Sequence, residues 1–134
     1  MPPMPGAPTE LLAKVDLFSD LDQRELKQIA AAMNDYSFEA GRAVVTEGAG
    51  GVGFFVIEEG KAKVTAEGGD LRSLGPGDYF GEIALIGDTK RSATVTAETP
   101  LKCWALTSWA FRPIVANNSS IAWKLLQALA RLLQ

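Results

Sequence analysis

The spacing of hydrophobic residues changes twice along this chain of 134 residues. Near the N-terminus hydrophobic residues recur every three or four positions, as at Leu26, Ile29 and Met33, which is the period of an amphipathic helix. From Tyr36 to Leu106 the runs are short and the period falls towards two. Helical spacing then returns. The pattern predicts helices over Thr9–Phe18, Asp22–Asn34 and Ile121–Gln134.

The middle of the chain predicts a mainly β structure. Glycine-rich turns separate the short runs at regular intervals, which is typical of a sandwich or barrel. The predicted strands are Tyr36–Phe38, Ala43–Thr46, Gly53–Ile57, Lys61–Ala66, Leu71–Leu74, Tyr79–Phe80, Ala93–Ala97 and Leu101–Leu106. In the strand over Leu71–Leu74, we expect both leucines in the core and Arg72 in solvent.

The C-terminal region predicts two helical segments of unequal length. Pro113 lies inside the segment Trp109 to Val115, and because proline lacks an N–H group we expect about one turn of helix there. Ile121–Gln134 has apolar residues on two sides, more than one packed face requires. Such a helix either packs fully on its own domain or offers its second side to a ligand or another chain.

Composition narrows the classes of function. The chain has no histidine, which argues against the usual serine or cysteine nucleophile mechanisms and against histidine metal sites. With a net charge of −3 it lacks the basic character of nucleic-acid-binding domains, and no apolar run is long enough for a membrane span. Cys103 alternates within a predicted strand, and we interpret it as a small buried hydrophobe.

Glu82 and Arg91 carry the most informative chemistry. They lie on one short connection that follows the glycine turn Gly75–Asp78. An arginine fork binds phosphate oxygens in a bidentate manner, and a carboxylate accepts hydrogen bonds from hydroxyl groups. Backbone N–H groups at a turn that leads into a helix add further donors for an anion. The pair predicts a site for a small anionic ligand that also carries hydroxyls.

The motif Phe80-Gly81-Glu82-Ile83-Ala84-Leu85, followed by Arg91-Ser92-Ala93, resembles the phosphate-binding cassette of cyclic nucleotide-binding domains. That family includes the bacterial catabolite activator protein and the regulatory subunits of cyclic AMP-dependent protein kinase. The resemblance extends from about Leu17 to the C-terminus. It implies a jelly-roll-like β-barrel (a double-stranded β-helix) with N-terminal helices and a C-terminal lid helix.

The resemblance also implies roles for individual residues. Arg91 would bind the cyclic phosphate and Glu82 the ribose 2′-hydroxyl, and Ser92 bears on the choice of base, which we expect to be adenine, with cyclic GMP as the alternative to cyclic AMP. The ligand-binding set is Gly81, Glu82, Ile83, Ala84, Arg91, Ser92 and Ala93. Candidates for the base pocket or the lid are Val64, Leu71, Leu74, Leu126, Leu129 and Leu133.

These expectations define a non-enzymatic regulatory module in the cytoplasm that binds a cyclic nucleotide and uses neither a cofactor nor a metal. We expect a flexible Pro-rich leader over residues 1–8, N-terminal helices over 9–35, the barrel over 36–106 and C-terminal helices over 107–134. A homodimer through the C-terminal helix or an effector domain outside this chain would complete the module. The alternatives are a degenerate barrel that only dimerises or acts as a scaffold, and a β-barrel enzyme.

Overall fold

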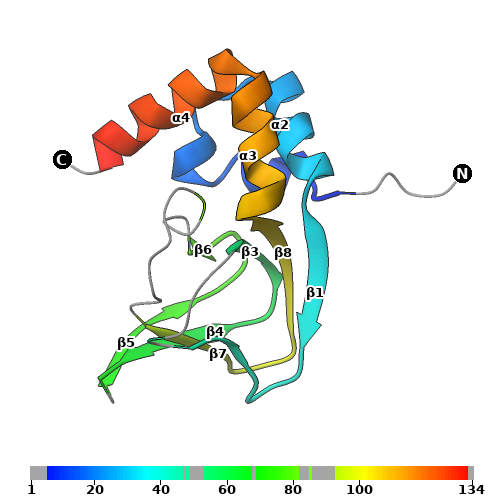
Figure 1. Ribbon diagram of the computed structural model, residues 1–134. Helices are drawn as coiled ribbons and strands as arrows, with labels where there is room; N and C mark the ends of the chain where they lie inside the picture. The colour runs from blue at the N-terminus through cyan, green and yellow to red at the C-terminus, as the bar shows by residue number, and fades with distance from the viewer. Residues whose placement is uncertain are drawn as a thin grey trace, which may run out of the picture.

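The computed structural model describes residues 6–46, 48, 53–67, 69–81, 85 and 93–132. The elements form three layers: helices, a helix-facing sheet and an outer sheet (Figure 1). The helix-facing sheet has the strand order β1-β8-β3-β6, and the outer sheet has the order β2-β7-β4-β5. Every strand pair is antiparallel. A mainly β domain with flanking helices is therefore confirmed.

The N-terminal helices are shorter than predicted. The expected helix over Thr9–Phe18 is two pieces, α1 (Thr9–Leu12) and the 3-10 turn η1 (Asp16–Phe18), because Val15 has an extended backbone between them. Next comes α2 (Gln23–Ala31), whose N-cap Asp22 accepts a hydrogen bond from the Glu25 N–H in a capping box. The prediction that α2 reaches Asn34 is wrong, since Asn34 already pairs with Ala105 in the sheet.

The end of the predicted Pro-rich leader belongs to the packed structure. Ala7 is buried, and its N–H donates to the carbonyl of Ala30 at 3.0 Å. Gly6 lies so close to α2 that a Cβ would stand 2.4 Å from the Ala30 oxygen. The predicted flexible segment 1–8 is therefore too long at its C-terminal end, and residues 1–5 lie outside the described part of the chain.

Strand β3, in the interior of the helix-facing sheet, is buried on both faces. Phe54 and Val56 join the cluster of apolar side chains under the helices, while Phe55 and Ile57 face the outer sheet. This explains why Gly53–Ile57 is a continuous apolar run instead of an alternating one. The sheet consists of β1 (Asn34–Phe38), β8 (Leu101–Thr107), β3 (Gly53–Glu59) and β6 (Tyr79–Phe80).

The outer sheet packs its inner face against the helix-facing sheet. Apolar side chains of both sheets form one inter-sheet cluster, to which the outer sheet contributes Ala62, Val64, Leu74, Val95 and Ala97. Its strands are β2 (Ala43–Val45), β7 (Thr94–Ala97), β4 (Ala62–Ala66) and β5 (Gly69–Leu74). Among the described strands, the two sheets of the predicted jelly-roll-like barrel pack face to face as separate hydrogen-bonded units and do not close on each other.

The C-terminal region departs from the prediction at Pro113. Helix α3 (Ser108–Asn117) continues through this proline, although about one turn was expected. The Thr107 hydroxyl caps its start, and Phe111 and Ile114 are buried beneath the helix, so capping and packing outweigh the lost hydrogen bond. Helix α4 (Ser119–Leu132) follows, with the Asn118 side chain accepting from the Ile121 N–H. Within the described ranges no helix is long and apolar enough to cross a membrane.

Glu25 fastens α4 to the N-terminal helices. Its buried carboxylate accepts from Lys124 Nζ at 2.6 Å and from Ser120 Oγ at 2.8 Å. These bonds, led by the one from Lys124, hold the pKa of Glu25 below its usual value of 4.5 despite burial. Asp20 adds a second ion pair, with Arg131 near the end of α4. The helices at the two ends of the chain therefore form one layer.

Replacing Glu25 with Gln should weaken that layer. The loss of the charge-assisted bond to Lys124 should lower the free energy of unfolding by about 1.5–3 kcal/mol. Urea titrations at pH 7 measure it, with Glu10→Gln on the exposed side of α1 as the matched control. Because the pKa of Glu25 is lowered in the folded state, its contribution is present above pH 4.5 and is lost as the pH falls through the folded-state pKa. Equal stability of both variants at pH 7 would contradict this role.

Candidate functional site

A tight turn over residues 75–78 and the two-residue strand β6 lead directly into the predicted cassette. The Gly75 N–H donates to the Asp78 carboxylate at 2.8 Å, and the Ile57 N–H donates to the Asp78 carbonyl, which fixes the turn on β3. Strand β6 follows at once. Gly81 then has φ +85°, a conformation that strains residues with a Cβ, so glycine allows the chain to leave β6 at this angle.

Aromatic contacts hold β6 on both of its faces. Phe80 stacks on Phe55 with ring centroids 5.2 Å apart, on the side of the outer sheet. Tyr79 lies 5.7 Å from the Phe54 ring on the helix side, and its hydroxyl bonds to Asp16 of η1 at 3.4 Å. Strand β6, which precedes Gly81, is therefore held by both apolar clusters, through Tyr79 on one face and Phe80 on the other.

The structure places only part of the predicted ligand-binding set. Gly81 and Ala93 are described, whereas Glu82, Ile83, Ala84, Arg91 and Ser92 lie outside the described residues. Ala93 precedes β7 and packs against the inter-sheet cluster. Between the two ends, Leu85 is buried to 2% exposure and belongs to the cluster under the helices. The cassette thus begins and ends beside the inter-sheet cluster and contacts the helical layer through Leu85.

The inner face of the outer sheet supplies the predicted pocket residues Val64 and Leu74. Both are buried in the inter-sheet cluster, whereas Leu71 is 61% exposed, so its prediction as a core residue is wrong. Val64 pairs with Arg72 and the next residue, Thr65, pairs with Asp70, which makes Leu71 the extra residue of a β-bulge. The odd spacing between Leu71 and Leu74 could have warned of this, because residues three apart in a regular strand point to opposite faces.

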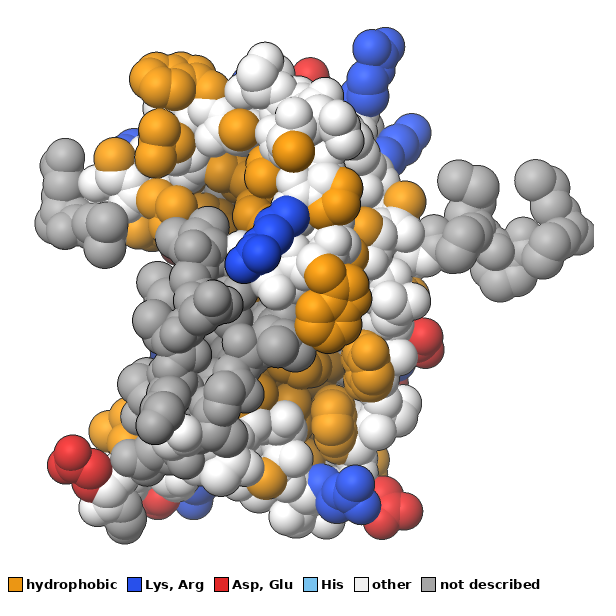
Figure 2. Space-filling model, in the orientation of Figure 1, with side chains coloured by type: hydrophobic (Ala, Val, Ile, Leu, Met, Phe, Trp, Pro, Cys, Tyr) orange, Lys and Arg blue, Asp and Glu red, His pale blue; other side chains and the backbone are white. Residues whose placement is uncertain are grey.

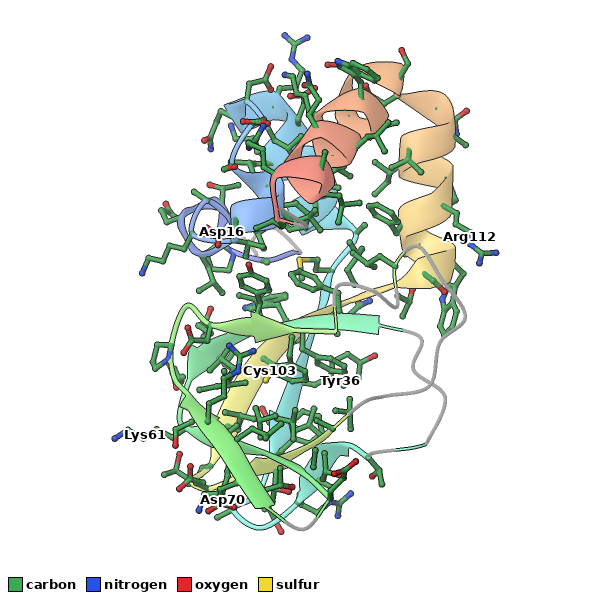
Figure 3. All side chains as sticks on the ribbon, turned by 90° about the vertical axis from the view of Figure 1, so that its left-hand side faces the viewer. Asp16, Tyr36, Lys61, Asp70, Cys103 and Arg112 are labelled. Atoms are coloured by element: carbon green, nitrogen blue, oxygen red, sulfur yellow. The ribbon has the colours of Figure 1, made fainter. Side chains whose placement is uncertain are left out.

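Arg72 reaches solvent, as predicted, but from the face of the sheet that also carries Val64 and Leu74. It pairs directly with Val64 and stands two residues from Leu74, so its side chain leaves the inner face of the sheet. Arg72 is exposed, as expected. On the outer face Lys63 pairs with Asp70 at 3.3 Å. Figure 3 shows Asp70 at the outside of β5. Alternation counted back from Leu74 would have placed Arg72 on the same face as Leu74.

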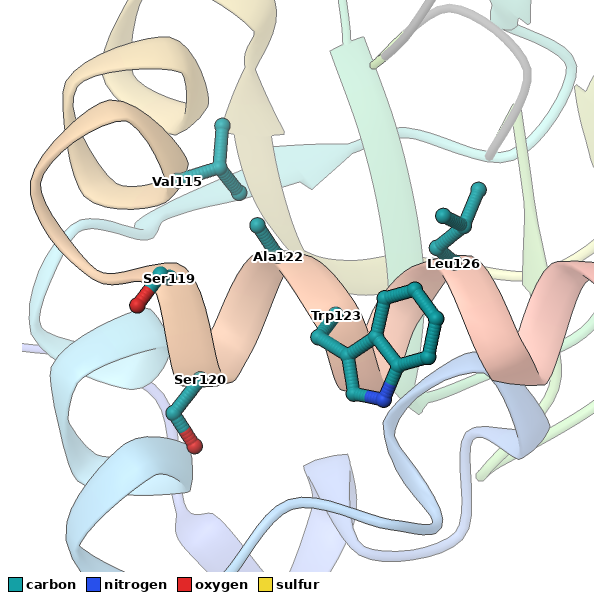
Figure 4. A pocket seen from close by; sticks show the side chains of 6 residues that line it. All are labelled: Val115, Ser119, Ser120, Ala122, Trp123 and Leu126. Atoms are coloured by element: carbon teal, nitrogen blue, oxygen red, sulfur yellow. The ribbon is translucent and has the colours of Figure 1, made fainter.

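One of the predicted lid residues, Leu126, lines an open groove. Its lining includes Val115 of α3 together with Ala122, Trp123 and Leu126 of α4 (Figure 4), and its volume is about 590 Å³. Trp123 is 60% exposed and Leu126 57% exposed, and apolar side chains gather over this part of the helical layer in Figure 2. Leu129 packs against the helical cluster, and Leu133 lies outside the described residues. The second apolar side of α4 therefore faces solvent.

Cys103 plays the structural part that the sequence predicts. It is fully buried between the sheets, and this burial raises the pKa of its thiol to about 12. Among the described residues, no group of histidine, cysteine, aspartate or glutamate side chains is arranged to hold a metal ion. The described part of the site therefore offers the turn at Gly81, the small side chain of Ala93 and the apolar side chains of the inter-sheet cluster.

Comparison with known proteins identifies the family. Residues 36–118 match the family described as "Cyclic nucleotide-binding domain". The chain belongs to the cyclic nucleotide-binding domain family. The match begins in β1 and ends directly before α4, so it includes both sheets and the whole predicted cassette. The family recognised from the cassette motif is thereby confirmed.

Individual relatives agree with this assignment. A cAMP-dependent protein kinase regulatory subunit of Yarrowia lipolytica is 46% identical over 93 residues, which are 68% of this chain and 25% of that protein. The chain thus spans about a quarter of that relative's length. The N-terminal domain of a transcriptional regulator from Streptomyces coelicolor A3(2) superimposes with a TM-score of 0.87 and 30% identity, over 92% of this chain and 91% of that one. The jelly-roll fold of the family is therefore confirmed.

A solved complex shows the same fold with a ligand. The regulatory domain of Toxoplasma gondii PKA, solved with cAMP, superimposes with a TM-score of 0.74 and 28% identity over 92% of this chain and 48% of that one. Its similarity includes the sheets on either side of the cassette, because the aligned part is nearly the whole of this chain.

The burial of Cys103 predicts an inert thiol. At pH 8 an aromatic disulfide reagent should react with the folded protein at least about 100-fold more slowly than with the protein unfolded in urea, since the thiolate is the reactive species and the pKa is raised to about 12. Absorbance of the released thiol measures the two rates. Fast labelling without loss of structure would show that the sheets open at this position.

Proposed function

We propose that this domain is a non-catalytic sensor that binds cyclic AMP through the segment from Gly81 to Ala93. Arg91 contacts the cyclic phosphate, Glu82 contacts the ribose 2′-hydroxyl, and the N–H groups of Ile83, Ala84 and Ser92 add donors to the phosphate. The observation that supports this most is the family match across the intact cassette sequence. The two described ends of the cassette are consistent with this proposal. The chain turns away from β6 at Gly81, and Ala93 lies directly before β7, against the inter-sheet cluster.

The proposal includes a route from the site to the helices. Leu85 is buried in the cluster that also holds side chains of α3 and α4, so a change in the cassette alters the packing under the C-terminal helices. Ligand binding shifts the position of α4 if the ligand binds one position better than the other. Ser92 and the inner face of the outer sheet contact the base, with adenine as the expected base and guanine as the alternative.

The exposed side of α4 supports a role for this helix in covering the ligand or in contacting another chain or domain. Trp123 and Leu126 offer an apolar surface that the domain itself leaves uncovered. We infer that it either closes over the ligand or contacts a second copy or an effector domain. A cytoplasmic location fits the free thiol of Cys103, which a reducing compartment preserves.

Replacing Arg91 with Ala should nearly abolish binding of cyclic AMP. Two charge-assisted hydrogen bonds to the phosphate, at about 1.5–3 kcal/mol each, correspond to a loss of about 10²–10⁴-fold in affinity. Isothermal titration calorimetry of the folded variant measures this. The matched control is Arg24→Ala, which removes the same charge from the exposed side of α2.

The same assay separates phosphate binding from ribose binding. Glu82→Ala should bind cyclic AMP more weakly and should no longer distinguish it from the 2′-deoxy analogue. Unchanged affinity of a folded Arg91→Ala variant would contradict the proposed site, and full discrimination by Glu82→Ala would remove Glu82 from the ribose contact.

Tryptophan fluorescence should report the movement of α4. Trp123 is 60% exposed on α4, so a change in its surroundings upon saturation with cyclic AMP should shift its emission. Trp109 is 64% exposed on α3 and provides the matched comparison. The variant Trp123→Phe should lose most of the shift, whereas Trp109→Phe should keep it. A shift that survives Trp123→Phe would show that α4 is not the moving element.

A further inference from the structure

Strand β1 differs from the other edge strands of the two sheets. Among the described strands, the edges are β1 and β6 in the helix-facing sheet and β2 and β5 in the outer sheet. Short strands, bulges and irregular pairing protect a sheet edge, because a long regular edge recruits another strand. Strand β6 has two residues, β2 has three with an irregular register, and β5 carries the bulge at Leu71. Strand β1 has none of these three protections.

The edge of β1 is regular and open to solvent. Its five residues pair one to one with β8 from Asn34 to Phe38, without a shift in register. The first four residues are exposed, and Phe38 is half-buried. In Figure 1, β1 runs along the outside of its sheet, and within the described part of the chain no strand pairs with its other side. Backbone N–H and C=O groups along β1 therefore point away from β8, in the geometry that a further strand uses.

One face of β1 carries an aromatic ring that the domain leaves partly uncovered. Tyr36 pairs with Cys103, which belongs to the inter-sheet cluster, so its side chain lies on that face. The ring meets Phe55 edge-on with centroids 6.4 Å apart, yet the residue stays 45% exposed. Tyr36 is also the middle residue of β1. An aromatic ring on a further strand, directly opposite Tyr36, would cover this surface.

The other face of β1 carries one acid and one short polar side chain. Asp35 pairs with Trp104, which packs against the cluster under the helices, and Ser37 pairs with Lys102 on the same face. An acid brought opposite Ser37 by a further strand therefore extends a row that contains a lysine. The charges of this face favour a second acid at that position and not opposite Asp35.

The residues of β1 complement a second copy of β1 in antiparallel order. With the two-fold axis at Tyr36, the two tyrosines stand opposite each other, and Asp35 stands opposite Ser37 of the second copy. An axis at Asp35 would instead oppose two aspartates, and an axis at Ser37 would oppose Asp35 to Glu39. Like charges directly opposite destabilise a strand pair, whereas aromatic pairs stabilise it. The axis at Tyr36 is therefore the favoured one of the three.

The layers of the domain leave room for this pairing. The helices lie at the end of the sheet where β1 begins, since α2 ends at Ala31, shortly before Asn34 (Figure 1). In an antiparallel pair the helices of the second copy lie at the opposite end of the strands, so the two helical layers do not meet at the shared edge. Two-fold axes that join the same patch on both copies are the commonest symmetry of homo-oligomers.

We propose that two copies of this chain associate through β1, with Tyr36 at the two-fold axis, so that their helix-facing sheets form one continuous sheet. This interface includes no residue of the cassette and none of α4, so it does not depend on the proposed function.

Size-exclusion chromatography with light scattering tests the proposal on the whole chain. The wild type should become dimeric as its concentration rises. Tyr36→Glu places two carboxylates opposite each other and should raise the dissociation constant of the dimer at least about tenfold, whereas Tyr36→Phe keeps the pair of rings and should change it by less than about threefold. Leu126→Asp is the control for the exposed side of α4 and should leave the dimer unchanged. Circular dichroism shows whether each variant is folded.

Cysteine cross-linking tests the register independently. Tyr36→Cys brings two thiols to directly opposite positions, with Cα atoms about 4.5–5.5 Å apart, which a disulfide spans. Asp35→Cys is the matched control, because its two copies are offset by two residues and lie about 8 Å apart, too far for a disulfide. The natural thiol of Cys103 is buried with a pKa raised to about 12, so it does not interfere. Mild oxidation should give a covalent dimer with Tyr36→Cys and little with Asp35→Cys.

Three results would overturn the proposal. The first is a wild type that stays monomeric up to about 1 mM. The second is a dimer that Leu126→Asp disrupts and Tyr36→Glu does not, which would place the interface on α4. The third is equal cross-linking of the two cysteine variants. Each leaves the proposed function standing, and a chain that dimerises in this way without binding cyclic AMP would overturn the proposed function alone.

Discussion

The double-sided burial of β3 is the constraint on which the rest of the domain depends. Phe54 contacts Phe18 of the helical layer, with ring centroids 5.6 Å apart, while the next residue, Phe55, stacks on Phe80 towards the outer sheet. Because neighbouring residues of a strand point to opposite faces, one short segment joins both apolar clusters. The same two phenylalanines contact Tyr79 and Phe80, so the entrance to the cassette is fixed by the core itself.

This arrangement makes the cassette a connection between the two clusters. Gly81 and Ala93 lie at its ends near the sheets, and Leu85 lies in the cluster under the helices. In the proposed function, a ligand held by the cassette would act on the helical layer through the packing of Leu85. The ion pairs from Glu25 and Asp20 join the N-terminal helices to α4, so the proposed movement of α4 would involve both ends of the helical layer.

Local patterns predicted most of this fold, and the errors lie where packing or register outweighs them. All the strands could be placed from alternation and glycine turns, and the cassette from its residues in order. The continuation of α3 through Pro113 depends on the burial of Phe111 and Ile114, which no local pattern shows. The face of Arg72 depends on a bulge at Leu71, which becomes visible only when β4 and β5 are paired. The separation of the described strands into two sheets likewise depends on the pairing of strands far apart in the sequence.

The bulge in β5 affects two neighbouring residues, Leu71 and Arg72, in different ways. Leu71 moves from a predicted core position to solvent, and the inter-sheet cluster remains complete without it. Arg72 is exposed, as expected, but it pairs with Val64 and therefore lies on the face that carries the inter-sheet cluster. Strand β5 lies at the edge of its sheet and pairs on one side only, with β4. A long side chain with a charged end suits that position, because its stem can cover apolar surface while its guanidinium stays in water.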